Sequence, residues 1–145
     1  MAPMPWMLSL AALLAAGLLG GCTRSQPFIG KWQGERTDIL KGDESPTANT
    51  LRIVEVEIKR DGTFVYTSAG FPATGTFRPG NGGLLLDVKE VMGRSIESMG
   101  SSAVSQFRPL EVRRVDDTTI EIRDPGGVDR SWIQLKKVAE PATSP

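Results

Sequence analysis

The sequence predicts an all-β fold: a single antiparallel up-and-down β-barrel of about eight strands, preceded by an N-terminal signal helix. After residue 27, apolar and polar residues alternate with a period of two, and turn-forming residues interrupt the alternation at short intervals. No segment of this part repeats its apolar residues with sustained helical spacing. The strands that we predict cover residues 28–39, 51–60, 63–68, 74–78, 84–91, 106–115, the segment around 120–122, and 130–138.

Each predicted strand has one apolar face. In 51–60, Val54, Val56 and Ile58 alternate with charged residues, which is typical of a half-buried antiparallel strand. The dipeptide at 61–62, Asp-Gly, is a strong signal for the hairpin turn that follows. In the other strands the predicted inward residues are Phe28, Gly30, Trp32 and Gly34, then Phe64 and Tyr66, Phe77, Leu84, Leu86 and Val88, Leu110 and Val112, and Ile120 and Ile122.

The connections between these strands alternate in length. In an up-and-down barrel, alternate connections lie at opposite ends, so tight turns close one end and longer loops surround the other. Both ends of the barrel domain are then expected at the closed end, away from the loops 41–50 and 91–105. The tight turns are 61–62, 79–83 and 116–117, and the longer connections are 41–50, 69–73 and 92–105.

The loop 91–105 is the longest connection and carries several apolar residues. Met92, Ile96 and Met99 would align on one helical turn. One interpretation is a flexible lid with a Met-rich face that adapts to varied partners. The other is an excursion between strands that tucks its apolar residues over the barrel mouth.

An apolar stretch from Trp6 to Leu19 opens the chain and is followed by Gly20, Gly21 and Cys22. It is shorter than the roughly 20 residues that span a bilayer, and it has the length of a signal-peptide core. The run 18–22, Leu-Leu-Gly-Gly-Cys, resembles the lipobox of bacterial lipoproteins. The alternative is an uncleaved apolar segment with an incidental cysteine.

The lipobox resemblance implies cleavage before Cys22, lipid chains such as palmitate on this cysteine, and a lipid-anchored place in the cell envelope. Because position 23 is Thr rather than Asp, it further implies the outer membrane, facing the periplasm, if the source has two membranes. The expected organisation is a signal peptide (1–21), a lipidated tether (22–27), the barrel (28–139) and a disordered tail (140–145).

Composition excludes several classes of function. Lys and Arg number 17 together, as do Asp and Glu, so the formal net charge is zero and we expect no nucleic-acid partner. The sequence has no His and only one Cys, which excludes zinc sites built from Cys and His, intrachain disulfides and triads with a His base. We expect no enzymatic activity, no cofactor and no metal site, and no feature identifies a protein partner.

The first predicted strand opens with Phe-Ile-Gly-Lys-Trp at 28–32, and an Asp-Gly-Thr-Phe hairpin lies at 61–64. With an eight-strand meander, these motifs resemble the lipocalin-like (calycin) barrels. The Gly-x-Trp motif of that family corresponds to Gly30 and Trp32, and the resemblance implies that Trp32 plugs the closed end. It also implies that an Arg late in the chain stacks on the Trp, for which Arg114 is a candidate.

Two functions remain open: a barrel that binds a small apolar or amphipathic ligand, and a structural or interaction protein with a filled barrel. Large inward residues favour a filled core, whereas an apolar pocket above about 300 Å³ would favour a ligand. If a ligand binds, we expect it to be anionic at one end and held near the mouth by Arg52, Tyr66 and Arg108. Parity places all three inward, and guanidinium and phenol groups suit a carboxylate or phosphate.

Overall fold

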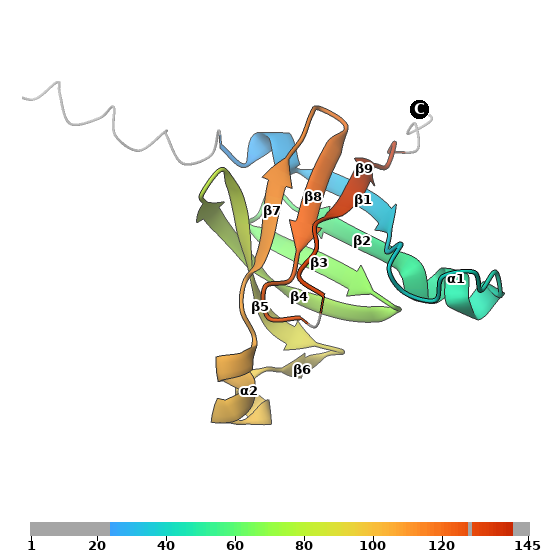
Figure 1. The fold of residues 1–145 in the computed structure, drawn as a ribbon. Coiled ribbons are helices and arrows are strands. Elements are labelled where there is room, and N and C mark those ends of the chain that lie inside the picture. Colours follow the sequence, from blue (N-terminus) through green and yellow to red (C-terminus); the bar gives the residue numbers. More distant parts are fainter. Residues whose placement is uncertain (1–23, 128, 141–145) are drawn as a thin grey trace, which may run out of the picture.

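Eight long strands close into one antiparallel barrel in the computed structural model, which describes residues 24–127 and 129–140 (Figure 1). Each strand pairs with its neighbours along the chain, and pairing of β9 with β1 completes the ring. The predicted up-and-down barrel is therefore confirmed. The strands are β1 (Gly30–Glu35), β2 (Ile53–Ile58), β3 (Thr63–Ser68), β4 (Phe71–Gly80), β5 (Gly83–Val91), β7 (Leu110–Arg114), β8 (Thr119–Arg123) and β9 (Ile133–Lys137); the short β6 (Arg94–Ser95) pairs only with β5.

The predicted apolar faces form the core. Alternate residues of the strands point inward, as the period of two requires, and they pack into one cluster. Tyr66, Phe77 and Val88 are only partly buried and pack against the edge of this cluster. Its buried members are Phe28, Trp32, Val54, Val56, Ile58, Phe64, Leu84, Leu86, Leu110, Val112, Ile120, Ile122 and Leu135.

The first strand is shorter than predicted, and the loop after it contains a helix. β1 ends at Glu35 rather than near residue 39, and α1 (Pro46–Arg52) occupies the end of the predicted loop 41–50. Ser45 begins this helix: its Oγ accepts a hydrogen bond from the Ala48 N–H at 3.2 Å, and proline follows at the first helical position. A serine cap followed by proline favours a helix start, so the signal lies in the sequence.

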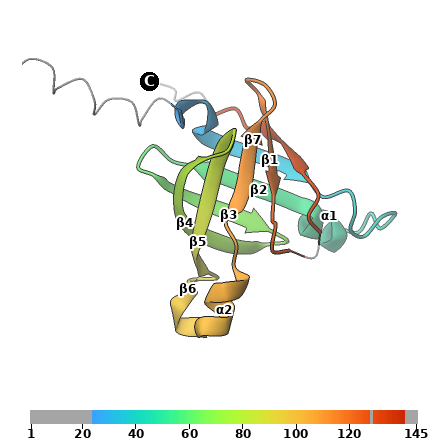
Figure 2. The ribbon, with the colours of Figure 1, turned by 60° about the vertical axis from the view of Figure 1, so that its left-hand side comes forward.

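The long loop 91–105 is folded into three short elements: β6, a 3-10 helix, η2 (Glu97–Met99), and α2 (Ser101–Gln106). This segment extends beyond the end of β5, away from the end where the described chain begins (Figure 2). Ile96 is buried but Met92 is exposed, so the apolar residues predicted to share one helical face do not pack together. The segment therefore borders the mouth instead of covering it with a continuous apolar face.

Trp32 lies buried at the closed end of the barrel. Its side chain is 1% exposed, and its Nε1–H donates a hydrogen bond to the Phe28 carbonyl at 2.8 Å. Gly30, two residues earlier, has a φ of 131°, which residues with a side chain rarely adopt. The cation over the indole ring is Lys137, with Nζ 5.4 Å from the ring centroid. Arg114 does not stack there, because it pairs with Asp117 in its own hairpin.

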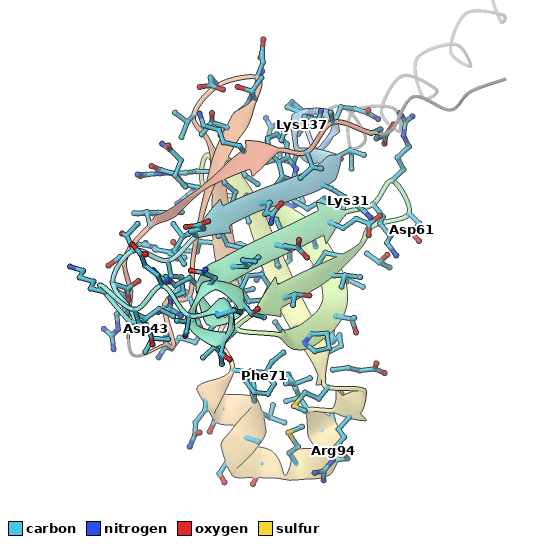
Figure 3. The ribbon with its side chains drawn as sticks, turned by 90° about the vertical axis from the view of Figure 1, so that its right-hand side faces the viewer. Lys31, Asp43, Asp61, Phe71, Arg94 and Lys137 are labelled. Carbon is cyan, nitrogen blue, oxygen red and sulfur yellow. The ribbon has the colours of Figure 1, made fainter. Side chains whose placement is uncertain are left out.

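Both described chain ends lie at the closed end of the barrel. A 3-10 helix, η1 (Gln26–Phe28), leads into β1, and the first residue of β1 pairs with Ile58 beside the tight turn at 61–62. Figure 3 places Lys31, Lys137 and Asp61 toward this end and Phe71 and Arg94 toward the opposite end. The predicted orientation is thus confirmed for the described residues, whereas Cys22, the signal peptide 1–21 and residues 141–145 lie outside them.

Aspartates close two of the three tight turns. Asp61 Oδ1 accepts hydrogen bonds from the Thr63 N–H and hydroxyl, and Asp116 Oδ1 accepts the same pair from Thr118. The Thr63 hydroxyl and N–H lower the pKa of Asp61, and the Thr118 N–H and hydroxyl lower the pKa of Asp116. Both carboxylates therefore favour the folded state only while they are ionised.

Substitution of Gly34 by Ala should destabilise the barrel where β1 meets β9. A Cβ atom at this position would lie 2.2 Å from the Gln134 carbonyl oxygen and 2.7 Å from Leu135 Cδ2. Because the added methyl group forces β1 and β9 apart, the substitution should lower the free energy of unfolding by about 1–3 kcal/mol. Urea unfolding measures the change, and Gln33→Ala on the exposed face of β1 is the matched control. Equal stability of the two variants would contradict this account of closure.

Acid should destabilise the protein partly through Asp116. The pKa of Asp116 is lower in the folded than in the unfolded chain. Its contribution to the free energy of unfolding is therefore present above about pH 4 and is lost as the pH falls through the folded pKa. Asp116→Asn keeps an acceptor without the titration, and its melting temperature should fall less steeply between about pH 4 and pH 2. Thermal melts followed by circular dichroism test this, with Glu44→Gln, at an exposed carboxylate outside this turn, as control. An unchanged pH dependence in Asp116→Asn would refute the assignment.

Candidate functional site

A pocket of about 350 Å³ opens at the mouth of the barrel, between β3, β4, β5 and the segment that leads into β7. We call it the mouth pocket. Its volume exceeds the value of about 300 Å³ above which a small-molecule site is plausible in size. Half of the residues that line it are apolar, and the others are polar residues and one glycine. They are Phe71, Ala73, Val88, Val91, Phe107 and Leu110, together with Tyr66, Ser68, Gln106, Arg108, Asp124 and Gly126.

Apolar side chains surround the entrance of the mouth pocket. Phe71, at the start of β4, is 54% exposed, and Phe107, just after α2, is 42% exposed. Both also line the pocket, so an apolar surface continues from solvent into the barrel. A rim of this kind suits the entry of a ligand with an apolar part.

A second cavity of about 260 Å³ lies beside the mouth pocket, and the two share Tyr66, Ser68 and Asp124. We call it the Arg36 compartment. It lies where β1, β3, β8 and the segment before β9 meet, and polar residues dominate its lining. Those not shared with the mouth pocket are Arg36, Ile122, Arg123, Gly127, Asp129, Ser131 and Ile133.

The structure brings together two of the three predicted ligand-binding residues. Tyr66 and Arg108 line the mouth pocket, but Arg52 does not. The Arg52 guanidinium donates hydrogen bonds to the Ala48 carbonyl at 3.3 Å, to Asn49 Oδ1 at 3.1 Å and to the Asp43 carbonyl. β2 begins only at residue 53, so the strand alternation does not extend to Arg52, which instead holds α1 to its preceding loop.

Arg36 reaches the site that Arg52 was expected to reach, and the sequence interpretation missed it. Position 36 continues the inward face of residues 30, 32 and 34, so the same parity argument would have identified it. The backbone N–H of Arg36 donates to the Arg52 carbonyl at 2.8 Å, which places the two residues side by side at one level of the barrel. Their side chains then differ because residue 52 belongs to a helix.

Tyr66 lines both cavities. Burial raises the pKa of Tyr66, while a hydrogen bond with Ser68 and the charge of Arg36 lower it by less. The phenol therefore stays neutral at physiological pH, where its hydroxyl both donates and accepts a hydrogen bond. It can serve a ligand in either cavity.

Trp132 fixes the segment that carries Asp129 and Ser131. Its indole ring stacks against two guanidinium groups, at 4.1 Å from Arg113 and 4.6 Å from Arg123. Each of these arginines also pairs across the β7–β8 ladder with a glutamate, at 2.6 Å in both cases. This cation–π stack holds one wall of the Arg36 compartment in place without using the barrel core.

Comparison with known proteins gives no family. No protein-family model matches the chain, and no curated protein matches it in sequence. Among residues 24–127 and 129–140, no helix has the length and apolar character needed to cross a bilayer. Across the same residues, no group of three or more Cys, Asp or Glu side chains is placed to hold a metal ion.

Proposed function

We propose that the protein is an envelope lipoprotein, lipid-anchored through Cys22, whose barrel binds a small apolar or amphipathic ligand at its mouth. The observation that carries the ligand-binding part is the mouth pocket: it has a volume of about 350 Å³, half of its lining residues are apolar, and exposed Phe71 and Phe107 border it. Apolar cavities with a few polar groups on one side are the usual form of small-molecule sites.

The ligand occupies the outer part of the barrel only. Trp32 and Phe64 are fully buried toward the closed end, and side chains fill that half of the interior. This filled half is the observation that supports the alternative, a structural or interaction protein without a ligand. The two alternatives differ in whether the mouth pocket takes up a small molecule.

The proposed anchor fits the direction of the described chain. Arg24, two residues after Cys22, leads into η1 at the closed end, so an anchored barrel turns its mouth away from the membrane (Figure 1). In a source with two membranes, the proposed place is the outer membrane with the mouth toward the periplasm. The ligand would then enter from the aqueous side rather than from the anchoring bilayer.

Cys22→Ser should release the protein from the membrane fraction into the soluble fraction. The residue is the predicted attachment point, and two or more acyl chains are needed for stable anchoring because each buried methylene contributes only about 0.8 kcal/mol. Cell fractionation with immunoblotting measures the distribution, and mass spectrometry of the mature N-terminus detects the acyl chains. Ser25→Ala, three residues later, is the control. Membrane association that survives Cys22→Ser would rule out this anchor.

Filling the mouth pocket should abolish ligand binding. Ala73 lines the pocket, so Ala73→Trp places an indole in it, whereas Thr74→Trp, the next residue of β4, points to the opposite face. The uncharged fluorescent probe N-phenylnaphthylamine should bind the soluble Cys22→Ser chain and its Thr74→Trp form, and should bind the Ala73→Trp form at least about tenfold more weakly. Equal binding by both tryptophan variants, or no binding to any form, would favour the filled-barrel alternative.

A further inference from the structure

Arg36 holds a buried hydrogen-bond donor that has no acceptor. Its Nε is the one buried side-chain nitrogen or oxygen atom without a hydrogen-bond partner in the part of the chain that the structure describes. Buried polar groups of folded proteins are nearly always paired, because desolvation without a partner costs free energy. An unpaired donor beside a cavity of about 260 Å³ therefore indicates that an acceptor from outside the chain belongs there.

The neighbouring carboxylates do not supply this acceptor. The ion pairs of Arg36 use its other end: Nη2 lies 3.4 Å from Asp38 Oδ2 and 3.7 Å from Asp129 Oδ2. Asp129 Oδ1 already accepts from the N–H and the hydroxyl of Ser131. The guanidinium is thus neutralised at Nη2, while its Nε–H is buried and unpaired.

The charges in the lining of the Arg36 compartment cancel. Its lining holds two cations, Arg36 and Arg123, and two anions, Asp124 and Asp129. Outside the lining, Asp38 and Glu111 pair with those two arginines and add negative charge. A carboxylate or phosphate would therefore meet more negative than positive charge, and a cation could not accept the Nε–H of Arg36. An uncharged oxygen satisfies Arg36 without an added charge.

We propose that the Arg36 compartment binds the uncharged, hydroxyl- or carbonyl-bearing head of an amphipathic ligand whose apolar part fills the mouth pocket. The head oxygen accepts the hydrogen bond from Arg36 Nε–H. The hydroxyls of Tyr66 and Ser68, which line both cavities, bind the region where head and apolar part join. A head with several hydroxyls fits best, since its protons can also be donated to Asp124 and Asp129.

This inference rests on the proposed function and changes the ligand class expected from the sequence. Arg52 and Arg108 suggested an anionic head, but Arg52 lies elsewhere and the compartment beside Tyr66 is electrically balanced. The ligand class is therefore a neutral amphipath such as an acylglycerol, rather than a fatty acid.

Calorimetric titration of the full chain carrying Cys22→Ser tests the ligand class. The probes are monooctanoylglycerol and octanoate, which share an acyl chain and differ in the charge of the head. Monooctanoylglycerol should bind about tenfold more tightly than octanoate at neutral pH. Tighter binding of octanoate would overturn the neutral head.

Arg36→Lys tests the role of the buried donor, because lysine keeps the positive charge but lacks the Nε–H. It should weaken monooctanoylglycerol binding about tenfold, the loss expected for one hydrogen bond to a charged group, and leave N-phenylnaphthylamine binding unchanged. Arg78→Lys is the matched control, since Arg78 pairs with Asp87 at 2.9 Å on the exposed wall. Unchanged binding of N-phenylnaphthylamine also shows that the Arg36→Lys variant is folded. Tyr66→Phe should independently weaken the binding of monooctanoylglycerol.

The outcomes separate this inference from the proposed function. If no amphipath and no apolar probe binds the wild-type barrel, both fail. If the apolar probe binds but Arg36→Lys leaves monooctanoylglycerol affinity unchanged, the mouth pocket stands and the Arg36 compartment holds only water. That second result would overturn the inference alone.

Discussion

Close approach of the backbone at three glycines is the constraint on which the barrel depends. At Gly34, Gly75 and Gly83, an added Cβ would lie 2.2, 2.0 and 1.8 Å from a carbonyl oxygen of a neighbouring strand. All three lie within strands, where glycine otherwise weakens pairing. They allow the eight strands to coil into a closed cylinder, and Gly75 also adjoins the register shift between β4 and β5. Closure removes the sheet edges and fixes the volume inside.

That fixed volume is divided between core and site. Large side chains, above all those of Trp32 and Phe64, fill the interior near the tight turns. The hydrogen bond from Trp32 to the Phe28 carbonyl fixes the segment before β1 to this part of the core. At the other end, the inward positions carry residues with polar groups, such as Tyr66 and Arg36, instead of purely apolar ones. Apolar burial therefore stabilises one half of the barrel, and the mouth pocket and the Arg36 compartment lie in the other half.

The sequence predicted the strands well because their signal is local and repeated: each half-buried strand shows its own alternation, as Val54, Val56 and Ile58 do. The ends of strands were predicted less well, because alternation does not show where pairing stops. The error at Arg52 arose there, one residue before β2 begins.

Tyr66 and Arg108 were placed correctly in one pocket, but Arg36 and Asp129 meet only through the ring that β9 closes. Such a long-range juxtaposition leaves no local pattern in a single sequence.

Unequal strand lengths explain why the site lies on one side of the mouth. β4 and β5 have 10 and 9 residues, whereas β7, β8 and β9 have 5 each, so the β4–β5 wall extends past its neighbours (Figure 2). On the long side the wall supplies apolar residues such as Val88 and Val91, which form the mouth pocket. On the short side the chain leaves the sheet early, and its irregular segments bring Arg36 and Asp129 together with hydrogen-bonding groups that no strand partner uses. An apolar cavity and a polar, charge-balanced one thus adjoin because the barrel is taller on one side, and this asymmetry gives the mouth its amphipathic character.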